Sequence, residues 1–170
     1  MQKSYVDVTG HSIVYPEWSS GFWQCKNRYH NQSQIMDVAY GHVSRNYPVS
    51  LIVIDYFNWF PLPLGDEALS HECWPDPKSM VDELKAVGIE LMISPYFNFV
   101  SEMSRNFQLA QANGFLVQDA RGDPVKVAFA NAAHSHSAYA DGDGYIYDLF
   151  QPEAREFAFN AIVDGYTRPY

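Results

Sequence analysis

Three short apolar runs, each followed by a loop and then by a stretch of helical periodicity, constrain the fold of this chain more than any other feature. The runs are GFWQC (21–25), LIVID (51–55) and IELMIS (89–94). The second run begins with four apolar residues without alternation, which is typical of a strand buried on both faces of a parallel sheet. Strands that alternate with helices predict parallel βα units, in an open doubly wound sheet or in a (β/α)8 barrel.

The helices after these runs have recognisable starts. We expect the first over about residues 33–45, with Ser33 as its N-cap. The second is expected to begin after the N-cap Asp76, with Pro77 in its first turn. The remaining expected elements are a helix at about 103–113, a hairpin over 115–129 with its turn at ARGDP, a short extended piece at 145–150 and a helix that starts at Pro152.

Polar and aromatic side chains stand where the three expected strands end. They are Gln24 and Cys25, then Asp55, then residues 94–96. Both architectures place ligands at the carboxyl ends of their parallel strands, so these positions predict a site. No GxGxxG follows a run and no GxxxxGK[ST] occurs. The dinucleotide-binding and nucleoside-phosphate-binding forms of the open sheet therefore lack support.

Charge and hydropathy exclude several classes of partner. The formal net charge is −9 at pH 7 and Lys and Arg form no cluster, so we expect no nucleic acid and no anionic membrane surface as a partner. The longest apolar runs are far below the roughly 20 residues of a membrane-spanning helix. The start of the chain, MQKSYVDVTG, lacks the apolar core of a signal peptide. We expect no membrane segment and no export signal, and the compartment stays open.

One loop raises the alternative of metal chemistry. His134 and His136 lie two residues apart in HSHS, but no third ligand of similar quality is near them in sequence. We therefore predict a polar loop, no metal and no cofactor, and keep a metal-dependent barrel enzyme as a competing hypothesis. Cys25 and Cys73 lack zinc-ligand spacing and are expected to be free thiols.

The chain is short for a complete barrel. A (β/α)8 barrel takes roughly 250 residues, whereas this chain has 170. We therefore predict an α/β fold in which residues 1–170 form a partial (β/α)8 barrel, its first three to four βα units. Such a piece exposes apolar strand surface, which predicts self-association through the exposed barrel edge.

Four stretches carry a resemblance to a known family. They are PEWSSGFWQCKNRY (16–29), RNYPVSLIVIDYFNW (45–59), GDEALSHECWPDPKSMVDELKAVGIELMISPY (65–96) and YDLFQPEAREF (147–157). Together they resemble glycoside hydrolase family 31, the α-glucosidase and α-xylosidase family, over most of residues 16–166. The resemblance implies the first part of a catalytic (β/α)8 barrel, without the family's β-sandwich domain and the rest of the barrel. It also implies retaining hydrolysis of terminal α-linked glucose or xylose from an oligosaccharide or glycoside.

The resemblance also implies roles for particular residues. The family's aspartate that hydrogen-bonds sugar hydroxyls in the cleavage subsite matches Asp55, and Asp148 falls in the family's Y-D-x-T-N-P motif. Trp residues near barrel strands are often core residues, and a structural carboxylate that caps the last helix is the competing interpretation of Asp148. The aromatic residues that the resemblance places around the subsite are Trp23, Tyr56, Trp59 and Tyr96.

The chain departs from the family pattern at two loops and in its catalytic groups. It reads GDEALSHECW, which includes Asp66, where GDWxFD is usual, and DLFQP where DxTNP is usual. The resemblance places the nucleophile on the strand after Tyr166 and the acid/base aspartate further on, so no catalytic residue is assigned in this chain. We expect substrate binding without the catalytic pair. The alternatives are a non-catalytic carbohydrate-binding protein and an inert truncated homologue.

Overall fold

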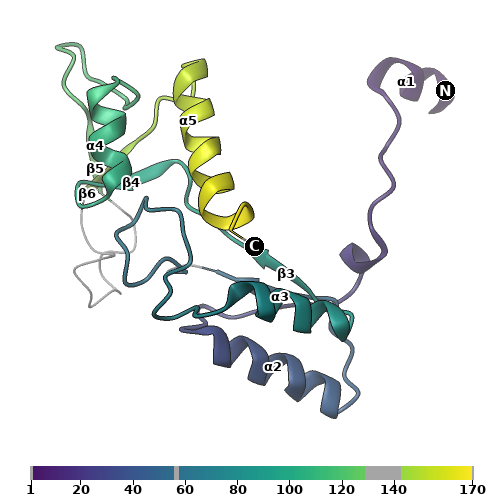
Figure 1. Cartoon of the computed structure of the whole chain (residues 1–170). Helices are drawn as coiled ribbons and strands as arrows, with labels where there is room; N and C mark the ends of the chain where they lie inside the picture. The colour runs from purple at the N-terminus through teal and green to yellow at the C-terminus, as the bar shows by residue number, and fades with distance from the viewer. Residues whose placement is uncertain (1, 56–57, 129–142, 170) are drawn as a thin grey trace.

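A three-stranded parallel sheet organises the first half of the chain. The computed structural model describes residues 2–55, 58–128 and 143–169 (Figure 1). The sheet contains β1 (Trp23–Cys25), β2 (Leu51–Ile54) and β3 (Glu90–Ile93) in the order β1-β2-β3. The register pairs Cys25 with Val53 and Ile54 with Ile93. The carboxyl ends of the three strands therefore lie at one edge of the sheet, as the sequence predicts.

Two helices and the central strand share one core. They are α2 (Gln32–Ser44) and α3 (Pro77–Ala86), which lie side by side in Figure 1. Ile52 and Ile54 from β2 pack in one buried cluster with helix side chains, among them Ile35 of α2 and Leu84 of α3. This packing explains the apolar run of β2, because a strand between two neighbours under a helical layer exposes almost none of its side chains to water.

The starts of the two helices follow capping chemistry. Asp76 caps α3 by accepting from the backbone N–H of Ser79 at 2.9 Å, and Pro77 opens the helix, as predicted. The prediction of Ser33 as the cap of α2 is wrong. Asn31 is the cap, since its extended backbone lets the side-chain oxygen accept from the Gln34 N–H at 3.1 Å. The Ser33 hydroxyl instead donates to that same oxygen, at 2.8 Å.

A small antiparallel sheet lies between β3 and the last long helix. It contains β4 (Phe99–Ser101), β5 (Lys126–Ala128) and β6 (Asp143–Ile146) in the order β4-β6-β5. The predicted turn at ARGDP is present, with the Gly122 N–H donating to the Asp119 carbonyl at 3.0 Å. The predicted hairpin is only partly correct, because β5 pairs with β6, and residues 115–118 contribute isolated bridges.

Two helices cover this second sheet. They are α4 (Arg105–Ala112) and α5 (Pro152–Ile162), and α5 continues into the π-helical segment η3 (Val163–Thr167). Phe107 and Ala110 of α4 share a buried cluster with Ala158 of α5. Among the described residues the chain thus has a parallel βα region and an antiparallel region, and α5 is the helix that returns from the second to the first.

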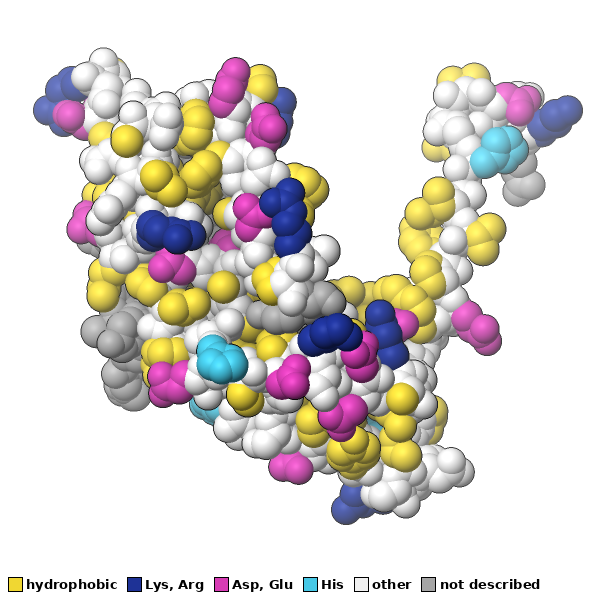
Figure 2. Space-filling model, in the orientation of Figure 1, with side chains coloured by type: hydrophobic (Ala, Val, Ile, Leu, Met, Phe, Trp, Pro, Cys, Tyr) yellow, Lys and Arg dark blue, Asp and Glu magenta, His cyan; other side chains and the backbone are white. Residues whose placement is uncertain are grey.

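The N-terminal segment lies apart from both regions. It contains α1 (Gln2–Thr9) and leads to the short 3-10 helix η1 (Glu17–Ser20) (Figure 1). Figure 2 shows apolar side chains along this segment, and Ile13, Val14 and Tyr15 are exposed. Within the described ranges, no helix is long and apolar enough to cross a bilayer.

Candidate functional site

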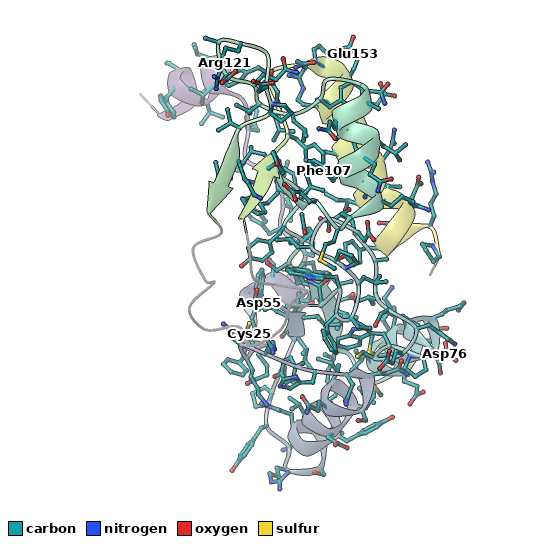
Figure 3. All side chains as sticks on the ribbon, turned by 90° about the vertical axis from the view of Figure 1, so that its left-hand side faces the viewer. Cys25, Asp55, Asp76, Phe107, Arg121 and Glu153 are labelled. Atoms are coloured by element: carbon teal, nitrogen blue, oxygen red, sulfur yellow. The ribbon has the colours of Figure 1, made fainter. Side chains whose placement is uncertain are left out.

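Asp55 lies directly after β2 and is half-buried. The Cys25 thiol, at the end of β1, donates to Asp55 Oδ2 across 3.8 Å. Figure 3 shows these two labelled side chains next to one another at the ends of their strands. Burial, and then the negative charge of Asp55, raises the pKa of Cys25, which keeps the thiol protonated and able to donate.

The end of β3 contributes Tyr96 to the same place. Burial, and then the charge of Asp55, raises the pKa of the Tyr96 hydroxyl. Tyr96 therefore stays neutral and presents both a hydroxyl and an aromatic ring near the carboxylate. The three parallel strands thus bring a thiol, a carboxylate and a phenol together at one edge of the sheet, a combination suited to hydrogen-bonding a polar ligand.

Trp59 supports this group from inside the protein. Its side chain is only 1% exposed, and its ring packs edge-on against Tyr96 with a centroid distance of 5.6 Å. A ring buried to this extent has little surface left for a ligand. Its observed role is to hold Tyr96, and the sugar contact proposed for Trp59 stays a prediction.

The other aromatic predictions have different outcomes. Trp23 is 40% exposed at the start of β1, where its ring lies 6.0 Å from that of Trp18. It is two residues from Cys25, roughly 7 Å along a strand, so it lies at some distance from the strand ends. Tyr56 lies outside the described residues, as do His134 and His136. No cluster of three or more metal-ligating side chains occurs in the described part of the chain.

Asp148 makes its hydrogen bonds where the chain enters α5. Its carboxylate accepts from Gln151 Nε2 at 2.9 Å and from the Phe150 N–H at 3.2 Å. These contacts order the turn before the helix, which is the structural interpretation of this residue. Within the described residues, the Asp148 carboxylate makes no hydrogen bond to Cys25, Asp55 or Tyr96, and its substrate role stays a prediction.

Asn58 organises the strand ends around Asp55, a role that the sequence did not predict. Its side chain is fully buried, and Nδ2 donates to the carbonyls of Asp55 at 3.3 Å and Ser94 at 3.2 Å. These bonds tie the end of β2 to the end of β3. Asn58 Oδ1 accepts from the Tyr166 hydroxyl at 2.7 Å. The available signal was a lone amide within an aromatic stretch, since a polar group there needs buried partners.

Glu67 is the second residue that went unassigned. It is 8% exposed in the loop between β2 and α3. Burial raises the pKa of Glu67, a hydrogen bond from Tyr166 to the carboxylate lowers it, and the negative charge of Asp66 raises it; together these effects give a pKa of about 7. The signal in the sequence was the glutamate itself, which stands where GDWxFD has tryptophan.

A cavity of about 550 Å³ lies in the second region, between the loop after β2, α4 and α5. Asp66, Arg105 and Asp164 contribute charged groups to its lining. Asp66 is already engaged there, because Oδ1 accepts from the Ser104 hydroxyl at 2.6 Å and from the Arg105 N–H at 3.0 Å. Asp55 does not line this cavity, so the cavity is distinct from the strand ends.

Comparison with known proteins identifies the family. Residues 12–167 match the sequence model of the family described as "Glycosyl hydrolases family 31 TIM-barrel domain". The chain belongs to glycoside hydrolase family 31. This family 31 chain is 35% identical over 164 residues to the uncharacterized family 31 glucosidase ORF2 of Pseudescherichia vulneris, covering 96% of this chain and 28% of the relative. It is 32% identical over 167 residues to alpha-xylosidase A of Aspergillus niger, covering 98% of this chain and 21% of the relative.

A solved structure gives the same result. A GH31 alpha-xylosidase from a soil metagenome, complexed with xylose, superposes with a TM-score of 0.75 at 36% identity, covering 90% of this chain and 21% of that chain. The resemblance to the family and the α/β, TIM-barrel class of fold are thereby confirmed. The chain spans about a quarter of the length of the curated relatives named here, and the number of βα units beyond the three described strands stays a prediction.

Proposed function

We propose that this family 31 chain forms the substrate-binding part of a retaining α-glycosidase that acts on terminal α-linked xylose or glucose. The observation that carries the proposal is Asp55, a half-exposed carboxylate at the point where three parallel strands end. Relatives named alpha-xylosidase, and a relative structure complexed with xylose, support the choice of substrate class.

The chemistry of Asp55 suits a sugar. An ionised carboxylate accepts hydrogen bonds from two vicinal hydroxyls, and such charge-assisted bonds are shorter and stronger than neutral ones. The Cys25 thiol donates to Oδ2, and a ligand hydroxyl can donate to Oδ1. Tyr96 adds a neutral hydroxyl from β3. The group therefore offers both acceptors and donors to a neutral polyol.

We further propose that these 170 residues bind substrate without cleaving it. A retaining glycosidase needs two carboxyl groups about 5 to 5.5 Å apart across the scissile bond. Two residues after each of β1, β2 and β3 make six positions at the strand ends, and Asp55 is the one carboxylate among them. The expected behaviour is binding of methyl α-xyloside with no release of nitrophenol from p-nitrophenyl α-xyloside.

Calorimetry on two matched variants tests the proposed site. Asp55→Asn keeps the shape of the side chain but removes the charge, and should lower the affinity for methyl α-xyloside at least tenfold, about the worth of one charge-assisted hydrogen bond. Asp82→Asn makes the same change on the exposed face of α3 and should leave affinity unchanged. Equal affinities for wild type and Asp55→Asn would exclude this site.

A further inference from the structure

A chain of two buried side chains and one half-buried side chain links the loop after β2 to the end of the strand that carries Asp55. Glu67 lies within hydrogen-bonding reach of the Tyr166 hydroxyl, and that hydroxyl lies 2.7 Å from Asn58 Oδ1. Asn58 Nδ2 in turn donates to the carbonyls of Asp55 and Ser94. The chain thus runs from a titratable carboxyl group to the backbone at the ends of β2 and β3.

The backbones around this chain are in direct contact. A Cβ atom added at Gly165 would come within 1.4 Å of the Glu67 carbonyl oxygen. η3 therefore packs against the loop after β2 with no room for a side chain. This contact fixes Tyr166, the next residue, between Glu67 and Asn58, so the three side chains are held together by the fold.

The direction of each hydrogen bond follows from what the atoms can do. Both bonds from Nδ2 end on backbone carbonyls, which only accept. Asn58 Oδ1 must therefore be the atom that faces Tyr166, and it too only accepts. The single hydroxyl proton of Tyr166 is then used in the bond to Asn58. While Tyr166 donates to Asn58, Glu67 can complete the chain only by donating a proton to the Tyr166 oxygen, which requires the carboxylic acid form. The bond that lowers the pKa of Glu67 is the alternative one, in which Tyr166 donates to the carboxylate.

The surroundings of Glu67 also favour the acid form. Its Oε2 atom is buried and has no hydrogen-bond partner in the part of the chain that the structure describes, which is costly for a carboxylate. Asp66 on its own loop and Tyr147, at the end of β6, are the other titratable groups that act on it. Arg105 and Asp164 line the adjoining cavity from α4 and η3. Burial raises the pKa of Glu67 to about 7, so ionisation falls within the physiological range.

We propose that Glu67 is a positioning residue for Asp55. As an acid, Glu67 donates to Tyr166 and thereby keeps Tyr166 bonded to Asn58. Asn58 in turn holds the end of β2, which carries Asp55, against the end of β3. When Glu67 ionises, its carboxylate competes for the Tyr166 proton and Asn58 Oδ1 loses its donor. The strand end that carries Asp55 is then held less firmly. The consequence for ligand binding rests on the proposed function of Asp55, whereas the switch in hydrogen bonding does not.

Nuclear magnetic resonance tests the switch without any sugar. In the 170-residue chain, the side-chain amide resonance of Asn58 should move between pH 5.5 and 8.5 with a midpoint near 7. Glu67→Gln, whose amide donates to Tyr166 at every pH, should abolish this titration and hold the resonance at its low-pH position. Glu72→Gln, an exposed glutamate in the same loop, should leave the titration intact. A resonance that does not move near neutral pH in the wild type overturns the inference.

Ligand affinity measured on the same proteins tests the second step. Wild-type affinity for methyl α-xyloside should fall about three- to tenfold between pH 6 and pH 8, the worth of one hydrogen bond, and the affinity of Glu67→Gln should stay at the pH 6 value. Tyr166→Phe should bind methyl α-xyloside with the affinity of the wild type at pH 8, at both pH 6 and pH 8. A wild-type affinity that is equal at pH 6 and pH 8 despite the moving resonance overturns the positioning role. Absence of binding in every protein at every pH, with the resonance still titrating, contradicts the proposed function instead.

Discussion

The parallel sheet and the antiparallel sheet hold their polar groups in different ways. At the parallel strand ends, the side-chain amide of Asn58 donates to two carbonyls and so fixes the backbone at Asp55. In the antiparallel region, Asp66 and Asp148 use their carboxylates on the starts of α4 and α5. At the parallel strand ends a carboxylate is therefore available to a ligand. In the antiparallel region the carboxylates accept hydrogen bonds at the starts of helices instead.

Substitution of Asn58 should have the largest effect on stability. Asn58→Ala removes the acceptor of the Tyr166 hydroxyl and the buried donor to two strand-end carbonyls, and should lower the free energy of unfolding by about 3 to 4 kcal/mol. Urea denaturation measures this change. Asn98→Ala, at an exposed asparagine, should change it by less than about 0.5 kcal/mol. Similar values for the two variants would show that the strand ends do not depend on the amide.

Ionisation of Glu67 should make the free energy of unfolding depend on pH. Below about 4.5, its ordinary pKa, the carboxyl group is protonated in both the folded and the unfolded chain. As the pH rises to about 7, the unfolded chain loses this proton while the folded chain keeps it, so the free energy of unfolding falls, by about 3 kcal/mol at most.

Denaturation of wild type and Glu67→Gln at pH 5 and pH 8 isolates this contribution. The wild type should lose more stability than the variant on going to pH 8, because glutamine carries no titrating group. If the two proteins differ in free energy of unfolding by the same amount at pH 5 and pH 8, the claim that Glu67 is a buried acid would be contradicted.

Removal of the two helix-start carboxylates should have a moderate effect. Asp66→Ala removes two bonds at the start of α4 and Asp148→Ala removes two at the start of α5, so each should cost about 1 to 2 kcal/mol. Asp66→Ala should not weaken sugar binding, once the measurement is made where both proteins are folded, and Asp148→Ala tests the substrate contact predicted for that residue. Loss of affinity in Asp148→Ala alone would move that residue into the ligand site.

The open edges of the parallel sheet should cause weak self-association. Within the described residues, β1 and β3 are the outer strands and each has one edge without a neighbouring strand. Backbone groups at such an edge are available to a second chain. Sedimentation velocity should show an average mass that rises with concentration, and a single monomeric species at all concentrations would contradict the prediction.

The sequence predicted the parallel region better than the antiparallel region, for a physical reason. β2 and α3 carry local signals, a continuous apolar run and a capped start with Pro77, that do not depend on distant partners. The pairing of β5 with β6 does depend on them, because residues 126–128 and 143–146 are far apart in the chain. The same limit applies to the site. Asp55 could be located from the end of its strand, whereas the roles of Asn58 and Glu67 depend on Tyr166, which only the fold brings to them.

Mapping of sugar-induced chemical shifts tests the central claim most directly, because it compares the two regions in one experiment. Titration of the isotope-labelled chain with methyl α-xyloside should move the backbone amide resonances of Cys25, Asp55 and Tyr96, at the parallel strand ends. Resonances of Arg105 and Asn160, which line the cavity of the second region, should stay in place. Shifts confined to Arg105 and Asn160, with the strand ends unchanged, would contradict the assignment of sugar binding to Asp55.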